Sequence, residues 1–423
     1  MKIFIRTVVI VTAVVTSIAQ AAGQPLPPAG DKWLEELLRS RASPLLLQIL
    51  DQPDTFQYQL VYTQINRDKN NRPHFKNYYL HLNPQQYFNP ASTVKLPVVL
   101  CALEKLNAIK VPGVSMHTAM LTDSSYSGQV KCWSDSLSES GLPSIAQYIK
   151  EILLVSDNDA YNRLYEFVGQ QTLNEKLWQK GYTGSRITRR FMPLTEEENR
   201  HTNAIRFVKD GQLLYAQPPA VNARPFDFTR RQLAGRAYYD RQNRLVMQPM
   251  DFTTHNVLLL QDLQQLLQSV LFPMSVPKNR RFGLTASDYK FLHQYLSELP
   301  RESRYPSYDT TEYFDSYTKF FMFRDGKAAI PDYIRVFNKP GWSYGFLTDA
   351  AYIADFKNNI EFMVSACIYT NSDGVLNDDK YEYESAGYPF FKETGTILYQ
   401  YELERFRPHK PSLSAFRLSY KDR

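Results

Sequence analysis

The chain has 423 residues, of which 43% are hydrophobic and 14% aromatic, so it is long enough for one large α/β domain or two interleaved ones. The formal net charge is +6, with 49 Lys and Arg against 43 Asp and Glu, and no compact basic run of the kind that binds nucleic acid is present. The composition therefore excludes a nucleic-acid partner. It favours solubility as the role of the charge, with weak attraction to anionic polymers of the cell envelope as the alternative.

The first 21 residues have the pattern of a secretory signal peptide. Lys2 and Arg6 give a positive start, residues 8–18 are mostly apolar, and Ala19 and Ala21 are the small residues that a signal peptidase reads. We expect secretion across the inner membrane, to the periplasm or the medium, with cleavage at or one residue after Ala21; an uncut anchor is the alternative. No Cys follows that would take a lipid. No later stretch has the roughly 18 apolar residues of a membrane span, so none is expected after signal removal.

The N-terminal third alternates between helical and extended patterns. Residues 31–50 have apolar residues at helical spacing, and residues 56–65 and 74–82 alternate like the two strands of a hairpin. An apolar helix then begins at Ser92, and residues 121–169 are mostly helical in pattern.

The remaining chain begins with a polar excursion at residues 184–250 and then becomes regular again. Helices are expected at 256–271 and 285–299, and strands surround a glycine-containing turn. The fold class expected is α/β, or α+β: an antiparallel sheet built from both chain ends with flanking helices, plus an inserted all-α lobe. The later strands are expected at 333–338, 350–356 and 360–369, and a closing helix is expected at 388–406.

These patterns predict a signal peptide followed by a single large domain. The boundaries expected are 1–21 for the signal peptide, 22–423 for the domain, about 32–90 and 300–405 for its α/β part, about 91–299 for the helical lobe, and about 184–250 for the excursion.

Cysteine and histidine usage indicates neither a disulfide framework nor a metal centre. The three cysteines are Cys101, Cys132 and Cys367, too few for stability to depend on disulfides. A Cys101–Cys132 pair and a buried free Cys101 both stay open. The seven histidines are scattered without zinc-ligand spacing, so no metal and no cofactor are expected.

Ser92 and Lys95 stand three residues apart at the start of the apolar helix. Residues at this spacing share a helix face, so the hydroxyl and the amine are expected within hydrogen-bond distance. A serine becomes a good nucleophile when a base takes its proton, and a buried lysine with a lowered pKa is such a base. Taken alone, however, the pattern favours an ordinary N-cap serine and a solvated lysine.

Two further motifs follow in the chain. Ser156 and Asn158 belong to a Ser-Asp-Asn motif, where the serine can relay a proton to a leaving group and the asparagine can hold a substrate amide. A capped turn between helices is the alternative for this motif. Lys339 and Gly341 belong to a Lys-Pro-Gly motif, where the cation can bind a substrate carboxylate and the glycine leaves room for substrate beside a strand.

The three motifs, in this order, resemble those of the serine β-lactamase and penicillin-binding protein superfamily, and class A β-lactamases most closely. The likeness extends over about residues 32–405. Asn162 is in register with the second asparagine of the class A helix, and the segment from Asp251 resembles the end of its Ω loop. The hairpin after Gly341 resembles the final class A hairpin, one residue shorter.

The resemblance implies a role for each motif residue. Ser92 would be acylated, Lys95 would deprotonate it, and Ser156 would pass a proton to the departing nitrogen. Lys339 would bind a carboxylate. The substrate-binding residues would be Asn158, Gly341 and Trp342. The backbone N–H groups of Ser92 and Trp342 would together form the oxyanion hole.

The chain departs from the class A pattern at two structural positions. Pro340 replaces the hydroxyl residue usual after the lysine, so a contact to the substrate carboxylate is lost. Arg189 resembles the arginine that anchors the Ω loop. If Arg189 pairs with Asp251, the two enclose a loop far longer than the class A loop.

The third departure concerns the residue that frees the acyl-enzyme. The Glu-x-x-x-Asn pattern of the class A Ω loop is absent between residues 184 and 250, and the glutamate position falls near Phe191. Glu196 and Glu198 lie a little beyond and are the candidate deacylation bases. A solvated acidic cluster is the alternative.

The sequence therefore predicts an exported serine hydrolase, similar to class A β-lactamases, that hydrolyses the amide of β-lactam antibiotics through an acyl-enzyme. The substrate would be a β-lactam, a related small amide or a peptidoglycan-derived compound. A penicillin-binding D-alanyl peptidase or an esterase is the alternative among enzymes. A catalytically weakened sensor that binds β-lactams or muropeptides is the alternative outside them. The sequence leaves the oligomeric state open.

Overall fold

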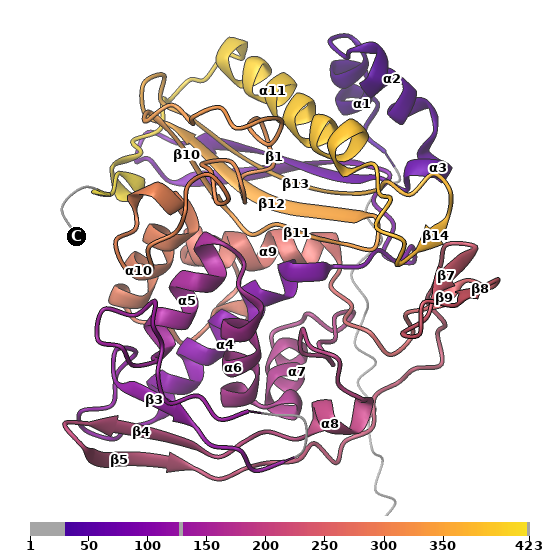
Figure 1. Cartoon of the computed structure of the whole chain (residues 1–423). Helices are drawn as coiled ribbons and strands as arrows, with labels where there is room; N and C mark the ends of the chain where they lie inside the picture. The colour runs from indigo at the N-terminus through magenta and orange to yellow at the C-terminus, as the bar shows by residue number, and fades with distance from the viewer. Residues whose placement is uncertain (1–29, 127–129, 421–423) are drawn as a thin grey trace, which may run out of the picture.

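The computed structural model describes residues 30–126 and 130–420 (Figure 1). The predicted signal peptide lies outside the described residues. Within the described part, no helix combines the length and the apolar character needed to cross a membrane.

A six-stranded antiparallel sheet joins the two ends of the chain (Figure 1). The N-terminal hairpin lies beside the C-terminal strands because β1 pairs with β13, with Leu60 opposite Ala366. This arrangement confirms the predicted antiparallel sheet and the predicted hairpin. The strands, in spatial order, are β10 (Ile334–Asn338), β12 (Phe346–Asp355), β13 (Ile360–Tyr369), β1 (Gln59–Arg67) and β2 (Pro73–Leu80), and β11 (Gly341–Ser343) also pairs with β12.

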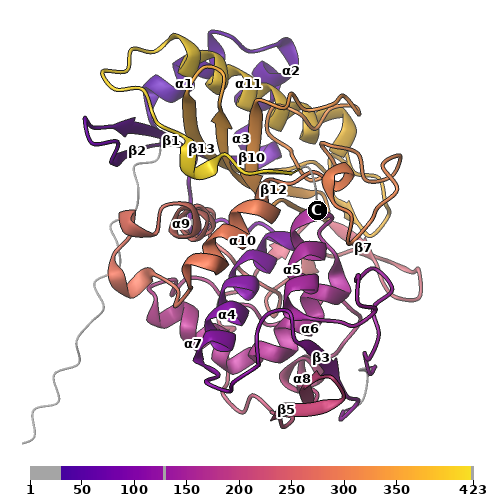
Figure 2. The same ribbon diagram turned by 90° about the vertical axis from the view of Figure 1, so that its left-hand side faces the viewer.

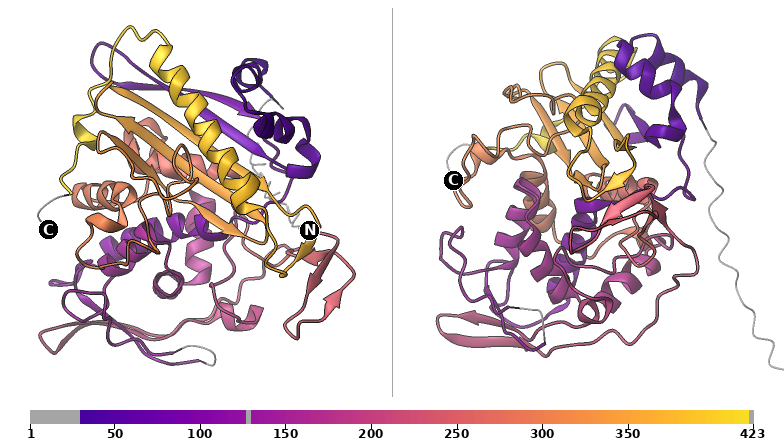
Figure 3. Two further views of the ribbon diagram at one scale, coloured as in Figure 1. Left: turned by 45° about the horizontal axis from the view of Figure 1, so that its top comes forward. Right: turned by 45° about the vertical axis from the view of Figure 1, so that its right-hand side comes forward.

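Helices cover both faces of the sheet, which is why every residue of β12 and β13 is buried. One face carries the N-terminal helices and the closing helix side by side (Figure 3), and the other carries α9 (Leu260–Leu271) (Figure 2). Ser43 caps a new helix by accepting from the N–H of Leu46, and this cap divides the predicted 31–50 helix in two. The helices of the first face are α1 (Lys32–Arg39), α2 (Pro44–Asp51), the short α3 (Pro53–Phe56) and α11 (Tyr388–Glu404).

The inserted lobe is built around α4 (Lys95–Ala108), most of whose residues are buried. The last helix of the lobe, α10 (Ala286–Ser297), begins at a capping box in which the side chains of Thr285 and Asp288 each accept from the other's backbone N–H. The lobe is not all-α as predicted, because residues 205–217 of the polar excursion form a hairpin that pairs with residues 119–122 in a small antiparallel sheet (Figure 1). The other helices are α5 (Ile145–Leu154), α6 (Asn158–Val168), α7 (Gln170–Gln179) and α10 (Ala286–Ser297), and the strands are β3 (Ala119–Thr122), β4 (Ile205–Lys209) and β5 (Gln212–Gln217).

The polar excursion returns to the main sheet near the end of β13. The hairpin of β7 (Ala237–Tyr239) and β8 (Leu245–Val246) is held there because β7 pairs in parallel with β14 (Val375–Leu376), and the side-chain amide of Asn377 donates to the carbonyl of Tyr239 at 2.9 Å. The elements of the excursion are α8 (Glu196–Arg200), β4 and β5, β6 (Leu233–Ala234), β7 (Ala237–Tyr239), β8 (Leu245–Val246) and β9 (Met250–Asp251).

All three cysteines are free thiols, so the Cys101–Cys132 pair that the sequence left open is not formed. Cys101 is fully buried in the lobe. The sulfur of Cys132 instead lies 3.4 Å from the hydroxyl of Tyr148.

Candidate functional site

Ser92 lies in a single turn of 3-10 helix, η1 (Ala91–Val94), directly before α4. The side chain of Asn89 accepts from the N–H of Ala91 at 2.8 Å, and the hydroxyl of Thr93 donates to the carbonyl of Pro90 at 2.6 Å. These bonds shape the turn that carries Ser92. Because the first turn of a helix leaves its N–H groups without partners inside the helix, the N–H of Ser92 is available to a ligand.

Lys95 begins α4 and is completely buried. Its ammonium group donates to the carbonyl of Ser156 at 2.5 Å, to the hydroxyl of Ser156 at 3.3 Å and to the side-chain oxygen of Asn158 at 2.7 Å. These three acceptors use its three protons, so the expected hydrogen bond between Ser92 and Lys95 is not formed. Burial lowers the pKa of Lys95 to about 7, against an opposing effect of Asp157. About half of the amine is therefore neutral at pH 7.

Ser156 occupies the connection between α5 and α6 in a left-handed backbone conformation, with φ of 64°. Such a conformation is uncommon for a residue with a side chain and is often found at functional sites. Asp157 fixes the following helix start by accepting from the N–H of Ala160 at 2.8 Å. The Ser156 hydroxyl thereby lies between two lysines, 3.3 Å from the nitrogen of Lys95 and 2.9 Å from that of Lys339.

Lys339 is fully buried between β10 and β11. Its ammonium group donates to Ser156 and to the carbonyl of Pro340 at 2.8 Å. Burial and the nearby charge of Lys95 hold the pKa of Lys339 well below its usual value. Two lysines so placed favour a site that donates hydrogen bonds and attracts negative charge.

A buried polar network lies around Lys339, and sequence reasoning missed most of it. The amide of Asn338 donates to both carboxylate oxygens of Asp349 at 3.0 Å, and the side-chain oxygen of Asn338 accepts from Lys319 at 2.9 Å. Burial raises the pKa of the Asp349 carboxyl to about 7 and lowers that of Lys319 to about 7. Lys319 carries no periodicity or motif that marks it, so nothing in the sequence could have identified it.

Strand β11 passes very close to the turn that carries Ser92. A Cβ atom on Gly341 would lie 2.6 Å from the backbone nitrogen of Ser92, so only glycine fits there. The N–H of Lys339 bonds to the carbonyl of Ala350, so alternate residues of this segment bond to β12. The N–H of Trp342 therefore faces the open edge of β11. Pro340 also faces away from β12, so its lack of an N–H group removes no hydrogen bond between this segment and β12.

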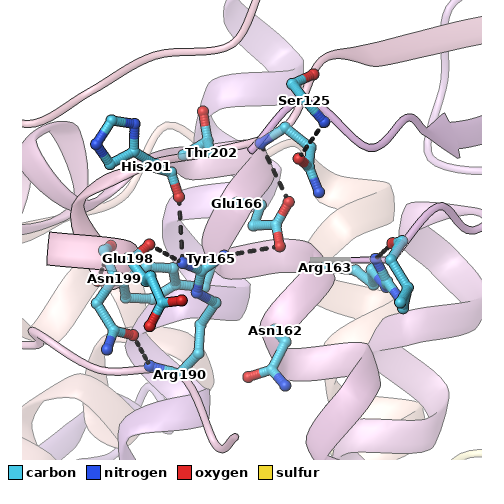
Figure 4. Close-up of polar contacts among 12 residues, drawn as sticks. Ser125, Asn162, Arg163, Tyr165, Glu166, Arg190, Glu198, Asn199, His201 and Thr202 are labelled. Atoms are coloured by element: carbon cyan, nitrogen blue, oxygen red, sulfur yellow. Dashed lines mark hydrogen bonds and ion pairs between the residues drawn. The ribbon is translucent and has the colours of Figure 1, made fainter. Parts of the chain in front are cut away.

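A different arginine from the expected one anchors the loop that starts the excursion. Arg190 forms a buried ion pair with Glu166 of α6 at 2.8 Å (Figure 4). It also donates to the backbone carbonyls of Glu198 and His201. The predicted Arg189–Asp251 pair is wrong, and the physical reason is that each residue has another partner. Asp251 pairs with an exposed arginine, Arg231, at 3.0 Å, and the guanidinium of Arg189 donates to the hydroxyl of Thr254 at 3.1 Å.

A pocket of about 420 Å³ lies beside Lys95, between residues 189–194 and the tip of the hairpin that follows β11. Asn158 and Ser343 also line it. Among the residues that the structure describes, no carboxylate lines this pocket. The two proposed deacylation bases are not brought to it. Glu198 instead closes a capping box at the start of α8, accepting from the N–H of Thr195 at 2.7 Å, and Glu196 is exposed on the same turn.

The ring of Phe191 lies where the sequence predicted the glutamate position. Its centroid is 4.9 Å from the Lys95 nitrogen. The side chain of Asn162 accepts from the N–H of Phe191 at 2.8 Å, and the hydroxyl of Tyr161 donates to the carbonyl of Arg189 at 2.8 Å. Helix α6 thus holds an aromatic ring, rather than a carboxylate, over the lysine.

Residues 46–251 match the model of the Beta-lactamase enzyme family. No curated protein matches the chain. Similar solved structures include a β-lactamase from Sphaerobacter thermophilus, at 13% identity and TM-score 0.44, covering 84% of this chain and 94% of that one. They also include one from Streptosporangium roseum, at 15% identity and TM-score 0.45 with 88% and 97% covered, and one from Desulfarculus baarsii, at 13% identity and TM-score 0.46 with 87% and 97% covered.

Proposed function

We propose that this chain, which belongs to the serine β-lactamase and penicillin-binding protein superfamily, opens β-lactams through an acyl-enzyme on Ser92 and hydrolyses that acyl-enzyme slowly. The observation that carries the proposal is the convergence of Lys95 and Lys339 on the hydroxyl of Ser156, beside the turn of Ser92. Family membership supports a serine enzyme that acts on β-lactams. The acyl-enzyme, the likeness to class A and export are the finer parts of the proposal.

In the acylation step, neutral Lys95 takes the proton of the Ser92 hydroxyl while the serine oxygen bonds to the β-lactam carbonyl carbon. A lysine pKa of about 7 supports this role because a useful fraction of the amine is neutral at pH 7. The N–H groups of Ser92 and Trp342 stabilise the oxyanion. Removing one such donor costs on the order of 10²–10³ in rate.

In the second half of acylation, the carbon–nitrogen bond breaks and the β-lactam nitrogen takes up a proton. Ser156 supplies that proton and recovers one from Lys95. The distances of 3.3 Å and 2.9 Å from its hydroxyl to the two lysine nitrogens support this relay. Lys339 holds the negative charge of the substrate carboxylate close to Ser156.

Release of the acyl group is the slow step of the proposed cycle. Hydrolysis of the ester needs a base that activates water, and no carboxylate lines the pocket among the described residues. The ring of Phe191 covers the side of Lys95 where such a base would act. This observation also favours the second candidate function, a penicillin-binding peptidase or a sensor that keeps its adduct.

One experiment separates these functions. Purified protein is mixed with a chromogenic cephalosporin, and absorbance and intact mass are followed together. We expect an adduct on Ser92 that forms within the assay and decays slowly with product release. An adduct that never decays supports the binding or sensor function. Neither adduct nor product, with a folded protein, refutes both, and Ser92→Ala must abolish whatever is seen.

Export to the periplasm or the medium is a separate part of the proposal, supported by the pattern of the first 21 residues. N-terminal sequencing of the protein recovered from a cell envelope fraction tests it. We expect the mature chain to begin at residue 22 or 23, and recovery of the full chain from the cytosol would contradict export.

A further inference from the structure

The pocket beside Lys95 contains positive charge that the proposed chemistry does not use. Arg189 lines it from the loop and Arg241 from the excursion. Its other walls are partly apolar, with Phe191, Met192 and the ring of Tyr344. A pocket with two guanidinium groups and an aromatic wall suits an organic group that carries a negative charge.

Arg189 is a half-buried arginine without an acidic partner. Within residues 30–126 and 130–420, no carboxylate lies within 4.0 Å of its guanidinium, and its one hydrogen bond goes to the neutral hydroxyl of Thr254. Its Nε atom is buried and has no hydrogen-bond partner. Glu196 attracts it only from a longer distance, and Arg241 repels it. A buried donor without a partner is costly, so an anion in the pocket would gain a charge-assisted hydrogen bond here.

Arg241 is presented to the same pocket by an anchored hairpin. It lies in the turn between β7 and β8, and β7 is tied to β14 through backbone pairing and through Asn377. The other arginine of that turn, Arg244, is already paired with Asp240 at 2.8 Å. In the part of the chain that the structure describes, no ion pair joins Arg241 to an acidic residue, so its charge is available to a ligand.

The pocket adjoins the reacting groups directly. Asn158 lines it and accepts from Lys95 at 2.7 Å, and Phe191 lines it with its ring 4.9 Å from the same nitrogen. Lys339 lies on the other side of Ser156. A substrate whose ring carboxylate faces Lys339 would therefore extend its acyl side chain toward Arg189 and Arg241.

We propose that this pocket selects acyl donors whose side chain carries a carboxylate, which Arg189 and Arg241 bind while Phe191 and Tyr344 contact the organic part. The inference rests on the proposed function, since it assumes that the acyl side chain enters this pocket. It identifies the excursion, through Arg241, as a specificity element.

The test compares two penicillins that differ by one group. Benzylpenicillin has a phenylacetyl side chain, and carbenicillin has the same side chain with an added carboxylate. The second-order rate constant of acylation is measured for each by intact mass and absorbance. We expect Arg189→Gln, and separately Arg241→Gln, to lower the carbenicillin-to-benzylpenicillin ratio by on the order of tenfold, which is about 1.4 kcal/mol, because each change removes a charge-assisted hydrogen bond to the side-chain carboxylate.

Arg244→Gln is the matched control, since it removes the same charge from the same turn while its guanidinium is already paired with Asp240. The ratio in this variant should equal that of the unmodified protein. A ratio that is unchanged in both the Arg189 and the Arg241 variants, or that falls equally in the Arg244 variant, overturns the inference.

A binding measurement keeps the two proposals distinguishable. Phenylacetamide and phenylmalonic acid monoamide, which keep the side-chain amide of the two penicillins and differ only by the carboxylate, are titrated into the Ser92→Ala protein by calorimetry. Tighter binding of the monoamide that is lost in Arg189→Gln supports the pocket even if no penicillin acylates Ser92, in which case only the proposed function fails. Equal or absent binding of the two compounds, together with an unchanged rate ratio, refutes the pocket.

Discussion

Replacing Arg190 with methionine is expected to destabilise the protein by about 3–5 kcal/mol. Both partners of the Arg190–Glu166 pair are shielded from water, with side-chain exposures of 0% and 2%, and their charged atoms are 2.8 Å apart. Removing one partner of such a pair leaves the other charge buried without compensation, which costs roughly 3–5 kcal/mol. The loss of the hydrogen bonds to Glu198 and His201 acts in the same direction.

The matched control is Arg189→Met, one residue earlier. Arg189 is half-buried and bonds to a neutral hydroxyl, so we expect its loss to cost about 1 kcal/mol or less. The assay is urea unfolding followed by tryptophan fluorescence, with limited proteolysis between residues 184 and 250 to detect local release of the loop. A double variant, Arg190→Met with Glu166→Leu, should recover much of the loss because no buried charge is left unpaired.

Three outcomes of this series would refute the reasoning. A loss below about 1 kcal/mol for Arg190→Met would mean that the buried pair does not anchor the loop. Equal losses of stability for the Arg189 and Arg190 variants would mean that Arg189 also anchors the loop, as the sequence suggested. A double variant less stable than Arg190→Met would show that packing around Glu166, rather than its charge, carries the effect.

Three further outcomes concern the chemistry. Acylation by the cephalosporin should speed up as pH rises through about 7, because the pKa of Lys95 lies there and only the neutral amine accepts a proton; a flat rate profile between pH 5 and 9 would contradict this. Gly341→Ala should slow acylation by on the order of 10²–10³, because its Cβ would lie 2.6 Å from the nitrogen of Ser92 and push β11 away; stopped-flow rates equal to those of the unmodified protein would argue against it. Phe191→Glu should shorten the lifetime of the adduct by on the order of 10², measured by intact mass. An equally long-lived adduct in a folded variant would contradict the idea that deacylation is slow because a base is missing at this position.

The two halves of the proposed cycle depend on different parts of the molecule. Acylation uses groups on the rigid elements around Ser92, namely the start of α4, the connection before α6 and strand β11. Deacylation and side-chain selection depend on the loop that begins at Arg189. The loop is the part that departs most from the class A pattern, so substrate range and turnover are where this chain should differ from enzymes that follow that pattern.

Features that depend on short-range geometry could be predicted from the order of residues alone. The hairpin of β1 and β2 and the helix after Ser92 follow from apolar periodicity. The spacing of Ser92 and Lys95 placed them about one turn apart where a helix begins, although the hydrogen bond expected between them is not formed. The motif residues could be assigned from their order along the chain, because that order can be read without knowing the fold.

Contacts between groups far apart in the chain depend on how the whole molecule folds. Ser156 and Lys339 are 183 positions apart, and their contact depends on the sheet that joins the two chain ends. The choice of Arg190 over Arg189 as the anchor depends on where Glu166 of α6 lies, and the use of Glu198 in a cap removes it from the pocket. A buried charge takes whichever partner the packing brings within reach, and the sequence does not encode that distance locally.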